Sequence, residues 1–216
     1  MIAMIQQFFM VQPLRNALVS VKDGLAPSTA NPFGIDDNML HQFQSIFCYL
    51  EKSTRQDHNP YKFCYAFKDT AGKPTNTAIQ QDAHEFLNIL FDRLERTLKP
   101  TPYKQLLQSV FGGKLCNQLI CSQCKQVKSN FEDMYTLSLE IKNQSTFQEA
   151  MNKMISNSII HGYLCERCQT RVDVTKQTLL STLPNVLIVH LQRFTYDFDL
   201  NMNAKVTYIY IVCNSI

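Results

Sequence analysis

The sequence predicts an α+β fold in which helices come first and a mostly antiparallel sheet follows. Apolar residues recur at helical spacing through the first half of the chain. After Gly112 and Gly113 the period changes to the alternation that is typical of strands. No internal repeat and no long Gly/Ser linker interrupts the 216 residues. We therefore expect a helical lobe beside a sheet lobe.

One helix is expected to begin near residue 38 and to continue to about Leu50. Asp36, Asp37 and Asn38 offer N-cap side chains directly before an apolar stripe. The residues of this stripe cover one face of a helix and are Met39, Leu40, Phe43, Ile46, Phe47 and Leu50.

A longer helix is expected over about residues 77–98. Asn76 or Thr77 offers a cap at its start, and Pro100 stops it shortly after its end. The polar residues around 72–74 mark the loop between the two helices. The predicted buried side of this helix comprises Ala83, Phe86, Leu87, Leu90, Phe91, Leu94 and Leu98.

The second half of the chain predicts strands and one short helix. Alternating apolar residues indicate half-buried strands over 115–119 and 135–141. A short helix is expected from Thr146 to about Ser156, with an acidic residue in its first turn. The run VLIVHLQRF (186–194) is almost continuously apolar, which is typical of a central strand covered on both faces.

The composition indicates a soluble globular protein. Apolar residues make up 45% of the chain and charged residues 18%. The net charge is only +3 and the basic residues are spread out, so no nucleic-acid partner is expected. No apolar run is long enough to cross a bilayer, and no secretory signal follows Met1, so no membrane partner is expected. We expect a cytoplasmic and/or nuclear location.

Four of the eight cysteines form two Cys-x-x-Cys pairs, Cys121 with Cys124 and Cys165 with Cys168. Four thiolates satisfy tetrahedral Zn²⁺ and leave no open position, so the sequence predicts a structural zinc site. The pairs would form two turns at the tip of a sheet, a zinc ribbon, with an insertion of 40 residues between them. Two alternatives remain: free cysteines in the core, or disulfides.

Asp82 and Glu85 stand three residues apart in the expected long helix, so their carboxylates lie on one face. One interpretation is a solvated acidic first turn that complements the helix dipole. The other is a binding site for a basic peptide, because guanidinium groups prefer carboxylate partners.

Several segments together resemble the ubiquitin-specific proteases. Among these, the sequence of the segments is most similar to the large fat-facets-type members. QQDAHEFL (80–87) resembles the second conserved box of that family, and the Cys-x-x-Cys pairs resemble the zinc ribbon of its fingers. LPNVLIVHLQRF (183–194) is similar to a strand of its palm. IQQFFMVQPLRNAL (5–18) is similar to the segment that follows its catalytic cysteine.

This resemblance implies a papain-like hand with a helical thumb (1–110), antiparallel β fingers carrying a zinc ribbon (111–180) and the incomplete start of a palm (181–216). It implies that ubiquitin or ubiquitinated proteins are the partners. The fingers would hold the body of ubiquitin, and its tail would run between thumb and palm. Asp82 and Glu85 would then face the arginines of that tail.

The resemblance also implies that the catalytic residues are missing from this chain, which we expect to be an inactive, partial product. The family's nucleophile would fall two positions before Met1, and its histidine box beyond Ile216. The tail VTYIYIVCNSI (206–216) departs from the family pattern. No other residue forms a predicted triad, including Cys48, Cys64, Cys116, His84, His161 and His190.

Three functions follow from these features. The first is a deubiquitinase catalytic-domain segment without activity of its own. The second is a non-catalytic zinc-ribbon module that binds ubiquitin. The third, a nucleic-acid-binding zinc ribbon, would need a basic face, which Ser122, Gln123 and Glu166 do not supply.

Overall fold

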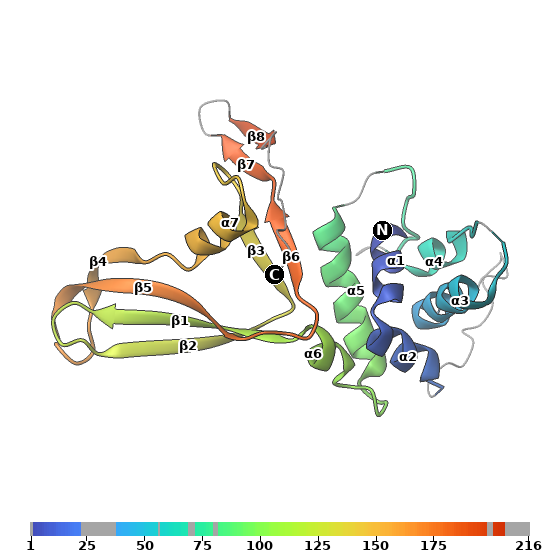
Figure 1. Cartoon of the computed structure of the whole chain (residues 1–216), viewed down its shortest axis with the longest axis horizontal. Coiled ribbons are helices and arrows are strands. Elements are labelled where there is room, and N and C mark those ends of the chain that lie inside the picture. The colour runs from blue at the N-terminus through green and yellow to red at the C-terminus, as the bar shows by residue number, and fades with distance from the viewer. Residues whose placement is uncertain are drawn as a thin grey trace. The chain divides into compact units, whose positions relative to one another are not determined.

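The computed structural model describes residues 2–22, 38–55, 57–68, 72–79, 82–197 and 201–205 (Figure 1). The chain divides into two compact units, Met1–Val110 and Phe111–Ile216. The first unit is helical and the second is built mainly of strands, so the predicted order of helices before strands is confirmed. Among the described residues, no helix has both the length and the apolar character that a bilayer crossing requires.

The first unit contains five helices among its described residues, and a sixth ends at the boundary between the units. They are α1 (Ile2–Met10), α2 (Gln12–Ser20), α3 (Met39–Lys52), α4 (Tyr61–Ala66), α5 (Ala83–Leu98) and α6 (Leu106–Phe111). Aromatic rings from α3, α4 and α5 form much of the core. The ring centroids of Phe43 and Phe47 lie 4.7 Å apart, those of Phe43 and Phe63 5.7 Å apart, and those of Phe67 and Phe86 4.9 Å apart.

The helix predicted to begin near residue 38 is confirmed as α3. The Oδ1 atom of Asn38 accepts a hydrogen bond from the backbone N–H of His41 at 3.2 Å, so Asn38 is its N-cap. Asp36 and Asp37 lie outside the described residues. The predicted stripe is buried except for its last member, since Leu50 keeps 37% of its surface exposed.

The longer helix begins later than predicted, at Ala83, and its cap is Asp82. Asn76 has a different local role, because its Oδ1 atom accepts from the backbone N–H of Ala78 at 2.9 Å in a turn. The predicted end is correct. Beyond Leu98 the hydroxyl of Thr101 donates to the Leu98 carbonyl at 2.8 Å, which satisfies a terminal acceptor of the helix.

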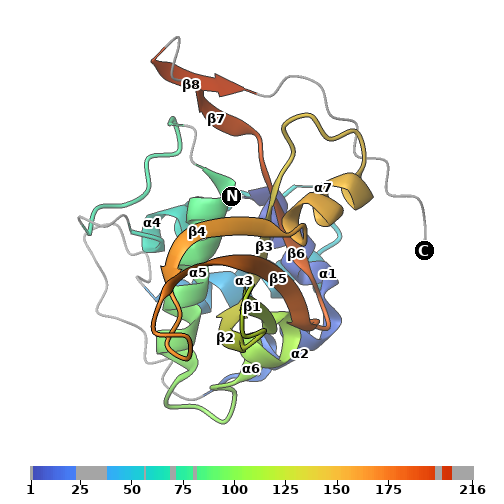
Figure 2. The same cartoon turned by 90° about the vertical axis from the view of Figure 1, so that its left-hand side faces the viewer.

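The second unit contains a four-stranded antiparallel sheet with the order β2-β1-β5-β4. Its strands are β1 (Gly113–Cys121), β2 (Val127–Met134), β4 (Ser158–Leu164) and β5 (Arg171–Thr182). Figure 2 looks toward the end of this sheet that carries the β1–β2 and β4–β5 turns. The sequence did not predict β2, whose residues are almost all exposed and carry no apolar alternation.

A smaller core lies beside this sheet, under α7 (Phe147–Met154). Strand β3 (Thr136–Glu140) alternates as predicted, with Leu137 and Leu139 buried and Ser138 and Glu140 exposed. The predicted short helix is confirmed, and Thr146 and Glu149 form a reciprocal capping box at its start. The buried members of this core are Leu137, Leu139, Ile141 and Ala150.

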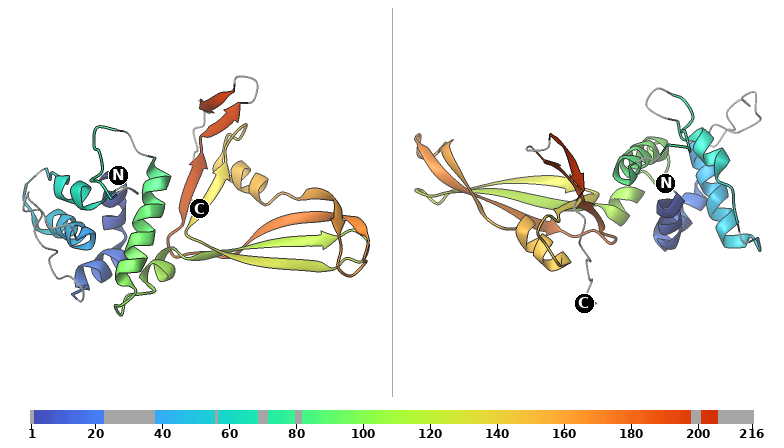
Figure 3. Two further views of the ribbon diagram at one scale, coloured as in Figure 1. Left: turned by 180° about the vertical axis from the view of Figure 1, so that it is seen from behind. Right: turned by 90° about the horizontal axis from the view of Figure 1, so that it is seen from above.

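The prediction for residues 186–194 was wrong in one respect. Strand β6 (Ile188–Gln192) pairs in parallel with β3, and within the described residues it has no second neighbour. Residues Ile188 to Leu191 are all half-buried, and Val189 and Leu191 contact the core around β3 and α7. The run has the apolar composition of a central strand without its complete burial, and Phe194 is 65% exposed. The chain continues into the hairpin of β7 (Phe194–Asp197) and β8 (Met202–Lys205) (Figure 3).

Candidate functional site

The first Cys-x-x-Cys pair occupies the turn between β1 and β2. The backbone N–H of Lys125 donates to the Cys121 carbonyl at 3.2 Å, and the N–H of Cys121 donates to the Gln126 carbonyl at 3.0 Å. Lys125 has a left-handed backbone with φ of 57°. This closed turn directs Cys121, at the end of β1, and Cys124, within the turn, toward the same point.

The second pair occupies the turn between β4 and β5 and has the same hydrogen-bond pattern. The N–H of Gln169 donates to the Cys165 carbonyl at 2.9 Å, and the N–H of Cys165 donates to the Thr170 carbonyl at 3.1 Å. Gln169 takes the left-handed conformation here, with φ of 56°. The two turns are therefore equivalent, and we call them the first and second knuckle (residues 121–126 and 165–170).

Strand pairing places the two knuckles at the same end of the sheet. Cys121 lies opposite Val174 in the antiparallel pairing of β1 with β5. The backbone N–H of Ser122, in the first knuckle, donates to the carbonyl of Asp173 at 3.0 Å, which joins the knuckle to β5. The cysteines that are distant in sequence therefore converge because of the sheet register.

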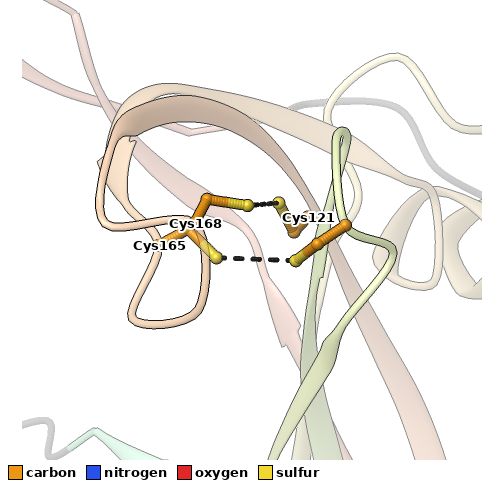
Figure 4. Close-up of side chains that lie close together, drawn as sticks. Cys121, Cys165 and Cys168 are labelled. Carbon is orange, nitrogen blue, oxygen red and sulfur yellow. Dashed lines mark hydrogen bonds between the residues drawn. The ribbon is translucent and has the colours of Figure 1, made fainter.

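The four Sγ atoms lie within 4.8 Å of one another. Those of Cys121 and Cys168 are 3.8 Å apart, as are those of Cys124 and Cys165 (Figure 4). Zinc–sulfur bonds of about 2.3 Å in a tetrahedron place the sulfur atoms roughly 3.8 Å apart. All four are free thiols, and they pack against an apolar floor of Leu119, Tyr163, Val172 and Val174. This donor set fits a closed metal site.

The electrostatics of the cluster favour a cation. The pKa of the Cys121 thiol is lowered to about 6 because the backbone N–H groups of Cys124 and Gln123 donate to its sulfur. The pKa of Cys168 is raised to about 12, chiefly because its thiol is hydrogen-bonded to Cys124. Metal binding needs deprotonated sulfur, and the lowered pKa of Cys121 means that this thiol gives up its proton more readily than an ordinary cysteine.

An ion pair links β2 to the second knuckle beside the cluster. The Nζ atom of Lys128 lies 2.6 Å from the Oε1 atom of Glu166. This contact raises the pKa of Lys128 and lowers the pKa of Glu166. Both side chains are exposed, so the pair adds little stability. No sequence pattern predicted it, because the partners are 38 positions apart, one on β2 and the other in the second knuckle.

The predicted acidic pair lies at the start of α5. Both side chains are exposed. The Oδ1 atom of Asp82 accepts from the backbone N–H groups of His84 at 2.7 Å and Glu85 at 3.1 Å. The structure thus places both carboxylates on the first turn, and it gives Asp82 a structural role as the N-cap. Gln80 and Gln81 lie outside the described residues.

Cysteines outside the cluster do not form a second chemical site in the described residues. Cys64 and Cys116 are buried, and burial raises the pKa of Cys64. Cys48 is half-buried on α3. His190 lies across the parallel strand pair from Ser138, with its Nδ1 atom 3.3 Å from the serine Oγ atom.

Sequence reasoning also missed a cavity of about 330 Å³ between α1 and α3 in the first unit. Its apolar side is formed by Ile5 and Ile46, and its polar rim includes Arg55 and His58. These residues come from three separate segments, so no local pattern indicated that they would meet.

Comparisons with known proteins identify relatives of one kind. The family model described as "Ubiquitin carboxyl-terminal hydrolase" matches residues 1–213. "Ubiquitin carboxyl-terminal hydrolase 24" from Mus musculus is 31% identical over 206 residues, 94% of this chain. "Ubiquitin carboxyl-terminal hydrolase 9X" from Mus musculus is 34% identical over 164 residues, 74% of this chain.

A third relative, "Probable ubiquitin carboxyl-terminal hydrolase FAF" from Drosophila melanogaster, is 31% identical over 183 residues, 83% of this chain. The chain spans 8%, 6% and 6% of the lengths of these three relatives.

Proposed function

Because the chain belongs to the ubiquitin carboxyl-terminal hydrolase family, we propose that it is a segment of a deubiquitinase catalytic domain that holds ubiquitin without hydrolysing its conjugates. The observation that carries this proposal is the match of the family model to residues 1–213. The cysteine cluster and the exposed acidic pair support it, since both lie in the segments that resemble the family's fingers and tail-binding helix.

The cysteine cluster is proposed to bind Zn²⁺ as a structural site. Cys121, Cys124, Cys165 and Cys168 would supply four thiolates, so no position would remain for water or substrate. The ion would join the first knuckle to the second and would keep the four-stranded sheet in register at its tip. It would take no part in hydrolysis.

The first unit is proposed to be the thumb of a papain-like hand, the four-stranded sheet its fingers, and β6 with the hairpin β7–β8 the start of its palm. The boundary at Val110 and Phe111 supports the division between thumb and fingers. Asp82 and Glu85 are proposed to bind a basic C-terminal tail of ubiquitin. Their exposure supports this role, because a mobile peptide can reach them.

No hydrolase activity is proposed for these 216 residues by themselves. A cysteine nucleophile needs a thiolate that the substrate can reach and a histidine that activates it. Cys64 and Cys116 are buried, and four further thiols face one another in the cluster. The same features suit a ubiquitin-binding module, which is the alternative function.

A hydrolysis assay tests the absence of activity. The purified chain is incubated with a fluorogenic ubiquitin C-terminal substrate, alongside a variant in which Cys48 is replaced by serine. We expect no turnover above buffer in either sample. Turnover in both samples would overturn the assignment of inactivity. Turnover in the unaltered chain that is lost in Cys48→Ser would overturn it as well, and would identify Cys48 as the nucleophile.

A binding titration with ubiquitin tests the acidic pair. Asp82→Asn retains a cap acceptor and removes only the charge, and Glu85→Gln removes the second charge. We expect the double variant to bind about fivefold more weakly, as the loss of two exposed charge pairs predicts. Asp92→Asn, farther along the same helix and 52% exposed, is the matched control and should bind as the unaltered chain does. An equal effect of the double variant and the control would rule out the proposed contact.

A further inference from the structure

We infer that the cysteine cluster is also a site of reversible oxidation, in which two disulfides cross between the knuckles, Cys121 with Cys168 and Cys124 with Cys165, and take the place of the metal. The inference concerns the cluster itself and does not depend on hydrolysis or on ubiquitin binding. Four cysteines allow three pairings, and the two sulfur–sulfur contacts of 3.8 Å belong to this one.

Sulfur contacts support this particular pairing. The Sγ atoms of Cys121 and Cys168 are 3.8 Å apart, and so are those of Cys124 and Cys165. Both contacts join one knuckle to the other, as Figure 4 shows for Cys121 and Cys168. A disulfide bond is about 2.05 Å long, so each pair must close by less than 2 Å. Rotation about the side-chain bonds of cysteines on turns can supply a movement of this size.

Chain connectivity favours bonds between the knuckles over bonds within a knuckle. A bond between Cys121 and Cys168 closes a loop over 47 positions, and one between Cys124 and Cys165 closes a loop over 41. A bond within either knuckle would close a loop over three positions. Longer loops restrict the unfolded chain more strongly, so the cross-knuckle disulfides stabilise the folded sheet more than bonds within the knuckles would.

The surroundings of the cluster also permit the oxidised form. Each knuckle is closed by its own backbone hydrogen bonds, which involve no sulfur atom. The first knuckle is further held by the bond from Ser122 to Asp173, and the ion pair of Lys128 with Glu166 connects β2 to the second knuckle. These contacts remain when the metal leaves. The sulfur atoms are therefore held near one another while the bonds form.

The chemistry requires a peroxide as the oxidant. One thiol of a pair attacks hydrogen peroxide and becomes a sulfenic acid, and one water molecule leaves. The facing thiol then attacks that sulfur, the S–S bond forms, and a second water molecule leaves. Formation of each disulfide transfers two electrons from the two thiols to one peroxide molecule. A zinc-loaded cluster, whose four sulfurs are thiolates, therefore consumes about two peroxide molecules, takes up four protons from solvent, and releases four water molecules and one Zn²⁺.

The different exposure of the four sulfurs determines which cysteine of each pair reacts with peroxide and which one then forms the disulfide. Cys121 and Cys165 are 3% and 5% exposed, whereas Cys124 and Cys168 are half-buried. Each cross-knuckle pair contains one buried and one half-buried sulfur. In the zinc-loaded cluster all four sulfurs are thiolates, so exposure decides which one reacts first. Peroxide reaches the half-buried member first, and its buried partner resolves the sulfenic acid before further oxidation.

Disulfide mapping on the zinc-loaded chain tests the inference. Increasing hydrogen peroxide is added, released zinc is read with a chromogenic chelator, and the protein is digested without reduction. Trypsin cleaves after Arg167 and so separates Cys165 from Cys168, while fragmentation distinguishes Cys121 from Cys124. We expect the two cross-knuckle bonds, about two peroxide molecules per zinc released, and renewed zinc binding after reduction.

The variant Cys168→Ser tests which cysteines pair with one another. In Cys168→Ser only one of the two proposed pairs remains, so we expect a single bond between Cys124 and Cys165 and a reduced Cys121. Bonds within the knuckles, the pairing of Cys121 with Cys165, or sulfinic acids as the main products would each overturn the inference. Cys48→Ser is the control, and its zinc release and disulfide map should match those of the unaltered chain.

Discussion

The Oδ1 atom of Asp82 accepts a hydrogen bond from the backbone N–H of Glu85 at 3.1 Å. The two acidic residues proposed to bind a basic tail are thus joined by the capping of their own helix. This relationship fixes the first turn of α5, and it leaves both side chains exposed. Substitutions at Asp82 consequently change helix stability as well as charge, and the two effects can be separated.

Asp82→Ala is expected to lower the free energy of unfolding by about 1 kcal/mol, because the N–H groups of His84 and Glu85 lose their acceptor. Asp82→Asn is expected to change it by only a few tenths of a kcal/mol, since asparagine caps as well as aspartate. Urea denaturation followed by circular dichroism measures both. Asp92→Ala controls for the loss of an exposed carboxylate. Equal losses in the alanine and asparagine variants would show that charge, and not capping, matters at this position.

The proposed zinc site predicts one zinc ion per chain by elemental analysis. Cys165→Ser is expected to lower zinc affinity by more than about tenfold, because removal of a direct ligand should exceed the effect of removing an outer contact. Cys116→Ser alters a buried cysteine outside the cluster and is expected to retain the metal. If Cys165→Ser and Cys116→Ser bound zinc equally, the metal site would lie outside the cysteine cluster.

Gly113→Ala is expected to destabilise the second unit by about 1–3 kcal/mol. A Cβ atom at this position would lie 2.9 Å from the carbonyl oxygen of Thr182 and 3.0 Å from the Cδ atom of Pro184. The backbone oxygen cannot move without disturbing the pairing of β1 with β5. Lys114→Ala, on the next residue, removes an exposed side chain and should change stability by less than about 0.5 kcal/mol. Thermal unfolding of both variants measures the difference.

Local chemistry made several elements predictable from the sequence. Asn38 precedes an apolar stripe and caps α3, and Thr146 with Glu149 forms the capping box of α7. The four cysteines were predicted to converge from their spacing alone, because paired thiols at this separation are typical of a zinc ligand set. In each case the residues that carry the information are close in sequence.

Predictions were wrong where distant residues decide the outcome. Asn76 is as good a cap as Asp82 in sequence, but it is used in a turn before the helix. The apolar run at β6 predicted burial on both faces, whereas every residue of β6 is half-buried or exposed. Strand β2 carries no apolar pattern, and its place beside β1 depends on cross-strand pairing. Sequence pattern specifies local conformation here better than it specifies strand neighbours.

Alkylation of Cys64 is expected to be slow and to depend on unfolding. Burial raises the pKa of this thiol above its ordinary value of 9.0, so the folded protein holds the proton. Its contribution to stability is present below the pKa of the unfolded chain and is lost as the pH rises through the folded pKa. Iodoacetamide labelling at pH 8, read by mass spectrometry, should modify half-buried Cys48 at least about tenfold faster. Equal rates in the folded protein would contradict the burial of Cys64.

From inside the core, Gln44 donates hydrogen bonds to backbone carbonyls at the end of the neighbouring helix α2. It is 8% exposed, and its Nε2 atom donates to the carbonyls of Leu18 at 2.7 Å and Val21 at 3.0 Å. Gln44→Leu keeps the volume and removes both donors, so we expect a loss of about 1–3 kcal/mol in the free energy of unfolding.

Gln44→Glu separates hydrogen bonding from packing at the same position. An ionised carboxylate cannot donate, and it would be buried beside two carbonyl oxygens, so this variant should be less stable at pH 7 than at pH 5, where protonation restores a donor. Gln148→Leu, on the exposed face of α7, should change stability by less than about 0.5 kcal/mol. Urea denaturation at the two pH values measures all three variants. Gln44→Glu stability that does not vary with pH would show that the carbonyls of Leu18 and Val21 do not need the Gln44 donor.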